Sequence, residues 1–112
     1  MLEVFFGSGL GGTFRYLLSL LATRLFGVTW PGTLFVNTLG ALILIGLGQK
    51  MESLGAPWAR FFNIGLLGGF TTFSTFSSEI FQKINQGKIT EALVIFGLNI
   101  ILGIIIGIFV FR

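Results

Sequence analysis

The chain has 112 residues, of which 54% are hydrophobic and 10% charged, and its mean hydropathy is +0.96. A water-soluble fold of this length cannot bury so much apolar surface, so we expect an integral membrane protein that forms one unit over residues 1–112. Cysteine and histidine are absent, which excludes disulfides and most transition-metal sites; the net charge of +3 is spread over segment ends, so we expect no nucleic-acid partner.

Four apolar segments are candidates to cross a bilayer core of about 30 Å, which takes roughly 20 helical residues. In chain order they cover residues 4–26, 33–48, 58–80 and 92–111. Pro31 and Pro57 stand near the expected helix starts, where a missing N–H is tolerated. Trp30 and Trp58 stand at span ends, as interfacial aromatic residues do. The sequence therefore predicts an all-α integral membrane protein with four transmembrane helices joined by short turns.

The first segment holds the only charged residue deep in a span, Arg15 in GLGGTFRYLLS. A buried arginine is costly unless it faces a wet cavity, and the glycines just before it would leave room for one. A cation in such a cavity would attract anions. The alternative is a structural ion pair with Glu79 or Glu3 of a partner chain.

The second segment, GTLFVNTLGALIL, places Asn37 at mid-span. Its amide is either a packing group that is hydrogen bonded to a neighbouring helix, or a donor directed at an ion in a pore. Asn99 in the fourth segment poses the same choice, with less in the sequence to decide it.

The third segment carries GLLGGFTTFSTF between Gly65 and Phe76. Gly68 and Gly69 each weaken a helix by about 1 kcal/mol relative to alanine, so we expect the helix to break at this pair, near the middle of the membrane. Breaks at this depth persist only where they are buried in protein or line a watery site. The backbone carbonyls that a break frees can hold an ion.

Beyond the glycine pair, Phe73 and Phe76 are three residues apart and share a helix face. The edge of an aromatic ring is electropositive, so two edges directed at a pore would favour a small anion. Thr72, Ser74 and Thr75 add hydroxyl donors. A phenylalanine stripe alone more often indicates packing, but together with the glycine pair and the hydroxyl cluster it favours an ion site.

Three glycine pairs with a spacing of four residues allow helices to approach closely: Gly7–Gly11, Gly65–Gly69 and Gly103–Gly107. Any one pair is as well explained by packing within a subunit as by contact between subunits. The three pairs together favour an oligomer.

The positive charges give no clear orientation in the membrane. With four spans, one side of the membrane carries Lys50, Arg60 and Arg112, and the other carries Arg24, Lys83 and Lys88. The positive-inside bias therefore has almost nothing to act on. We expect insertion in both directions, and hence an antiparallel, dual-topology dimer.

The motifs GGTFRY, GTLFVNTLGA and GLLGGFTTFSTFSSE together resemble the CrcB/Fluc family of fluoride channels, over essentially the whole chain. The resemblance implies an antiparallel homodimer with two fluoride pores, which passively exports cytoplasmic fluoride across the inner (plasma) membrane and so lowers its toxicity. Fluoride itself follows from the resemblance alone, and not from the physical pattern of the residues.

The resemblance also implies roles for particular residues. The carbonyls that hold the family's central structural Na⁺ fall on Gly68 and Thr71. The residues of the fluoride pore fall on Arg15, Asn37, Phe73, Ser74, Thr75 and Phe76. Many relatives carry tyrosine and serine along the fourth helix, where this chain has Ile95, Asn99 and Gly103.

Other functions fit the sequence less well. No enzyme is expected, because the four carboxylates Glu3, Glu52, Glu79 and Glu91 all lie toward span ends and no base stands near a nucleophile. The main alternative is a small multidrug-resistance-type proton-coupled antiporter, which has the same length and span count. That chemistry needs a carboxylate deep in the first span, where this chain has Arg15. A non-transporting scaffold would leave Arg15 and the central break unexplained.

Overall fold

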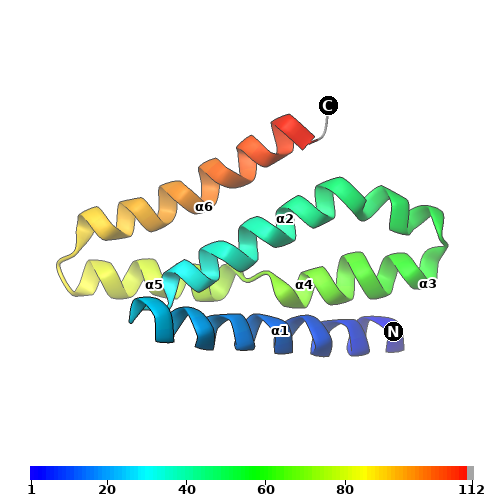
Figure 1. Ribbon diagram of the computed structural model, residues 1–112, viewed down its shortest axis with the longest axis horizontal. Coiled ribbons are helices and arrows are strands. Elements are labelled where there is room, and N and C mark those ends of the chain that lie inside the picture. Colours follow the sequence, from blue (N-terminus) through cyan, green and yellow to red (C-terminus); the bar gives the residue numbers. More distant parts are fainter. Residues whose placement is uncertain (111–112) are drawn as a thin grey trace.

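The computed structural model describes residues 1–110, and the regular secondary structure of this part of the chain is entirely helical, without strands. Figure 1 shows the helices lying roughly along the long axis of a molecule of 48 × 31 × 22 Å. Their bounds are α1 (Leu2–Phe26), α2 (Trp30–Ser53), α3 (Ala56–Ala59), the π-helical segment η1 (Arg60–Leu66), α4 (Leu67–Phe70), α5 (Phe73–Asn85) and α6 (Ile89–Val110).

Three of these helices, α1, α2 and α6, are long and apolar enough to cross a membrane. They contain the first and second predicted spans and, up to Val110, the fourth, and each begins two or three residues earlier than expected. Phe111, the last residue of the fourth predicted span, and Arg112 lie outside the described residues. The third predicted span is not one helix, because α3, η1, α4 and α5 divide the chain between Ala56 and Asn85.

Proline and glycine set the ends of several helices. Pro31 and Pro57 lie in the first turns of α2 and α3, which confirms the predicted helix starts. Gly27 and Gly87 both adopt φ 75°, in the left-handed region that favours glycine, in the turns after α1 and α5. These short turns place the ends of α1 and α5 beside the starts of α2 and α6 at one end of the molecule (Figure 1).

Two glycine pairs hold α1 against η1 and α4. A Cβ at Gly11 would collide with the carbonyl oxygen of Leu66, and a Cβ at Gly69 would lie 2.5 Å from that of Ser8. The pairs Gly7–Gly11 and Gly65–Gly69 therefore pack against each other inside one chain, and they no longer support an oligomer as the sequence suggested.

The third pair, Gly103–Gly107 on α6, makes no such backbone contact. A Cβ at Gly103 would meet nothing within 4 Å, and a Cβ at Gly107 would meet only the side chain of Ile45, at 3.8 Å. This pair is therefore not part of the close packing inside the chain.

The interruption between α4 and α5 lies at Thr71 and Thr72, both in extended conformation, with ψ 156° and ψ 123°. The predicted position of the break was therefore wrong, since Gly68 and Gly69 are still helical. Gly69 serves the close approach of α1 instead, and its intrinsic weakness in a helix is offset by that packing.

The interior is small, and most large apolar side chains face outward. Val36 of α2 and Ile95 of α6 have no exposed surface, whereas Phe5 of α1 is 71% exposed and Leu93 of α6 is 65% exposed. A single chain in water would not tolerate so much exposed apolar area. Together with the three long apolar helices, this surface identifies a multi-pass membrane protein.

Candidate functional site

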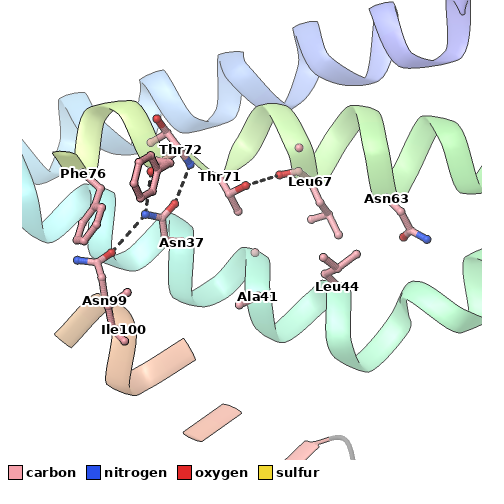
Figure 2. A pocket seen from close by; sticks show the side chains of 13 residues that line it. Asn37, Ala41, Leu44, Asn63, Leu67, Thr71, Thr72, Phe76, Asn99 and Ile100 are labelled. Atoms are coloured by element: carbon pink, nitrogen blue, oxygen red, sulfur yellow. Dashed lines mark hydrogen bonds between the residues drawn. The ribbon is translucent and has the colours of Figure 1, made fainter. Parts of the chain in front are cut away.

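A pocket of about 400 Å³ lies beside the interruption at Thr71 and Thr72. Figure 2 shows its lining side chains, which come from α2, η1, α4, α5, α6 and the interruption itself. The lining residues are Asn37, Gly40, Ala41, Leu44, Asn63, Leu67, Gly68, Thr71, Thr72, Phe73, Phe76, Asn99 and Ile100. Five of the eight residues predicted for ion binding thus line it, namely Asn37, Phe73 and Phe76 of the predicted pore and Gly68 and Thr71 of the predicted metal site, while Arg15, Ser74 and Thr75 do not.

Asn37 clamps the backbone of the interruption. Its Oδ1 accepts a hydrogen bond from the N–H of Thr72 at 2.8 Å, and its Nδ2 donates to the carbonyl oxygen of Thr72 at 3.1 Å. The same Nδ2 donates to Oδ1 of Asn99 at 3.3 Å, and Nδ2 of Asn99 donates to the carbonyl oxygen of Ile95 at 2.9 Å. These bonds give the extended backbone the partners that a helix would have supplied.

Three hydroxyl groups form hydrogen bonds at the N-terminus of α5. The Thr72 hydroxyl accepts from the N–H of Thr75 at 3.2 Å and lies 3.3 Å from the hydroxyls of both Ser74 and Thr75. A threonine at this position caps a helix by satisfying a free N–H of its first turn. The predicted hydroxyl cluster therefore exists, and its members bond to one another at the end of α5.

The two predicted pore rings have different surroundings. Phe73 is 78% exposed, whereas Phe76 is 6% exposed. Their ring centroids are 5.8 Å apart with planes inclined at 52°, and Phe76 also stacks on Phe96 at 6.4 Å. Phe96 is thus a third ring of this cluster that the sequence did not single out.

Some backbone carbonyl oxygens around the interruption accept hydrogen bonds and others do not. The Leu67 oxygen accepts from both the N–H and the hydroxyl of Thr71, each at 3.0 Å. Among the described residues, the carbonyl oxygens of Gly68 and Thr71 accept no hydrogen bond, and Gly68 is exposed. Free carbonyl oxygens of this kind suit a hard cation such as Na⁺, so the residues predicted for the metal fit that group.

Arg15 lies at the other side of the same segment. Its Nε donates to the carbonyl oxygen of Gly69 at 3.1 Å. Neither Glu79 nor Glu3 of its own chain pairs with it, since Glu3 contacts Arg60 at 3.3 Å and the terminal amine at 2.9 Å. Gly11, one of the glycines expected to open a cavity for Arg15, is closed by the Leu66 backbone.

The sequence matches the family described as CrcB-like protein, Camphor Resistance (CrcB), over residues 2–111. This chain belongs to the CrcB family. Three relatives of this CrcB chain are each named "Fluoride-specific ion channel FluC". The protein of Shewanella amazonensis is 38% identical over 89% of this chain and 80% of its own length. The proteins of Shewanella pealeana and Methylobacterium nodulans are 39% and 42% identical over 98% and 81% of this chain and 88% and 76% of their own lengths.

Glu79 of this CrcB chain is a buried carboxylate that the sequence placed merely toward a span end. It is 5% exposed, and its Oε2 accepts from the hydroxyls of Thr29 at 2.6 Å and Thr33 at 3.0 Å, while its Oε1 is buried without a hydrogen bond. Nearby, Glu91 contacts Lys83 at 3.2 Å and accepts from the Trp30 indole at 3.2 Å. The sequence could have indicated the burial of Glu79, because this residue lies three positions after Phe76 and therefore on the same face of α5.

Proposed function

We propose that this chain forms a fluoride-selective channel that passively exports cytoplasmic fluoride and so lowers its toxicity. One observation carries the proposal: in a member of the CrcB family, an aromatic pair, amide groups and an interrupted helix meet at a single pocket. Relatives that bear the name of fluoride-specific channels extend over most of the chain and support it further.

The conduction mechanism follows from the polarity of the pocket. Amide and hydroxyl donors replace the water molecules that fluoride loses on entering. The edges of Phe73 and Phe76 carry only a partial positive charge, so they attract the ion less strongly than a charged side chain would. Because none of the described residues that line the pocket has a positively charged side chain, the ion is bound weakly enough to leave again, as conduction requires.

The channel is an antiparallel, dual-topology homodimer with two pores in the inner (plasma) membrane. Helices α3 to α5 make the third of four crossings, as two half-helices that meet at Thr71 and Thr72. The high exposure of Phe73 supports the dimer, because a second copy would cover this ring where it borders the pocket. The carbonyls of Gly68 and Thr71 from both copies would hold the central Na⁺, which supplies a fixed positive charge when bound.

A liposome efflux experiment tests the function. The purified protein is reconstituted into liposomes loaded with potassium fluoride or potassium chloride, valinomycin is added, and the released anion is recorded with an ion-selective electrode. We expect fast fluoride release and negligible chloride release. No fluoride release, or transport of cationic dyes coupled to a proton gradient, would contradict the channel and favour the antiporter.

A further inference from the structure

We propose that an exposed polar stripe on α5 lines a water-filled approach, along which hydrated fluoride travels between the membrane surface and the pocket. The polar stripe consists of Ser74, Ser78, Gln82 and Asn85. This inference rests on the proposed function, since it names the route by which the ion of that channel reaches the ring pair.

The polar stripe occupies one face of α5 and begins beside the pocket. Its members recur every three or four positions, and all of them are exposed. Phe76, two positions before Ser78 and therefore almost opposite to it on the helix, is buried. At the start of the stripe, the Ser74 hydroxyl lies 3.3 Å from the hydroxyl of Thr72, which lines the pocket.

The length of the polar stripe matches the distance that an ion must cover. At a rise of 1.5 Å per residue, the helix from Ser74 to Asn85 extends over about 16 Å, roughly half of a bilayer core of about 30 Å. The interruption at Thr71 and Thr72 lies near the middle of the third crossing, and Figure 1 shows α5 running from it to the turn before α6 at one end of the molecule. The stripe therefore joins the middle of the membrane to its surface.

Contact with lipid does not explain the polar stripe. On α6, every exposed residue between Leu93 and Val110 is apolar, as contact with acyl chains requires. The exposed Thr13 and Thr23 of α1 donate their hydroxyls to backbone carbonyl oxygens one turn back, at 2.7 and 2.8 Å. Such bonds satisfy a hydroxyl that faces lipid.

The outer part of the polar stripe has no comparable bonds. The Ser78 hydroxyl accepts from the Gln82 amide at the long distance of 3.5 Å, and among the described residues neither side chain bonds to the backbone. Exposed hydroxyl and amide groups with unused donors and acceptors are costly in hydrocarbon. Water satisfies them, so these two side chains point to a wet surface.

The second copy of the proposed dimer covers a different face of α5. That copy is expected over Phe73, which precedes Ser78 by five positions and so lies about 140° from it around the helix. The polar stripe remains open when Phe73 is covered. Its uncharged side chains hydrogen bond to the water around an ion without trapping the ion itself, which suits an approach to a conducting pore.

Single cysteines test the approach, because the chain has no native cysteine. Ser78→Cys and Gln82→Cys are reconstituted into liposomes, and anionic sulfonatoethyl methanethiosulfonate is brought to both faces of the membrane by freeze–thawing. We expect the initial fluoride efflux rate to fall at least about twofold, because a fixed negative charge repels the ion on its way to the pocket. The cationic trimethylammonioethyl reagent, which is similar in size, should lower the rate less.

Ile84→Cys is the matched control. Ile84 is 49% exposed and lies nearer the end of α5 than Ser78, but it is about 120° away from Ser78 around the helix. Depth alone would favour reaction at Ile84→Cys, whereas a wet polar stripe favours reaction at Ser78→Cys. We expect neither reagent to change the efflux rate of the Ile84→Cys protein.

Mass spectrometry of the same liposomes separates the outcomes, and either stripe variant suffices if the other does not fold. No modification of the stripe cysteines would show that lipid or a second copy covers them, and modification with unchanged efflux would place the wet surface outside the ion's path. Either result, or a loss no larger with the anionic than with the cationic reagent, would overturn the inference. Absence of fluoride efflux from the wild type would instead overturn the proposed channel function.

Discussion

Phe76 is the ring of the pocket that the fold fixes most firmly. Its 6% exposure and its stacking on Phe96 leave it little freedom, whereas Phe73 is 78% exposed and is oriented by Phe76 alone among the described rings. A fixed ring presents its edge in one direction, which a narrow ion site requires. We therefore expect removal of the Phe76 ring to lower the fluoride efflux rate more than removal of the Phe73 ring.

We expect Phe76→Ile to lower the fluoride efflux rate roughly two- to tenfold, because an aromatic contact of this kind contributes about 0.5–1.5 kcal/mol. Isoleucine fills most of the space, so the protein should remain folded and keep its oligomeric state in size-exclusion chromatography. Phe81→Ile, at a 63% exposed ring on the same helix, is the matched control. An unchanged efflux rate in Phe76→Ile would remove this ring from the pathway.

Among the elements, the contact of α1 with η1 and α4 depends on missing side chains. Gly11 and Gly69 allow backbone-to-backbone approach, so the α1 helix supports the segment that precedes the interruption. In lipid there is no hydrophobic driving force between helices, and close packing of this kind is a main source of association. Gly11 and Gly69 do not line the pocket themselves, but through α1 they support the helical segment that does.

Gly11→Ala should destabilise the protein by about 1–3 kcal/mol, because the new methyl group must displace the Leu66 backbone and not a flexible side chain. Gly9→Ala is the matched control on the same helix, where a Cβ meets nothing within 4 Å, and it should be neutral or slightly stabilising. Thermal unfolding in detergent measures both. Equal melting temperatures for the two variants would contradict the observed packing.

In the molecule as a whole, charges are distributed evenly between its two ends. One end carries the ion pair of Arg60 with Glu3 at 3.3 Å, and the other carries that of Lys83 with Glu91 at 3.2 Å (Figure 1 shows the helices that bring them there). Glutamates contribute little to the positive-inside bias, so neither pair changes that bias. The undetermined orientation stays a prediction from the sequence.

Cysteine labelling tests the dual topology, since the chain has no native cysteine. We expect Ser53→Cys and Gln86→Cys, which lie at opposite ends, each to be labelled by a membrane-impermeant maleimide in about half of the molecules in intact cells. Adding positive charge beside one end with Glu52→Lys should shift both fractions in opposite directions. Full labelling of one variant and none of the other would show a single orientation and contradict the antiparallel dimer.

The sequence by itself determined the properties that depend on local pattern. Apolar length predicted the spans that α1, α2 and α6 now contain, and Pro31 and Pro57 predicted helix starts, because hydrophobicity and the missing proline N–H act within a few residues. The motifs were also sufficient to indicate the CrcB family.

Only the tertiary structure decided where the third segment is interrupted and how the polar groups around it are bonded. Thr72 is held by Asn37, 35 residues away, and Gly69, one of the two glycines expected to break the helix, packs against α1 instead. These outcomes depend on bonds between distant parts of the chain, which no local propensity encodes. Burial of Glu79 against Thr29 and Thr33 has the same origin, because separate helices must meet before a carboxylate can be enclosed.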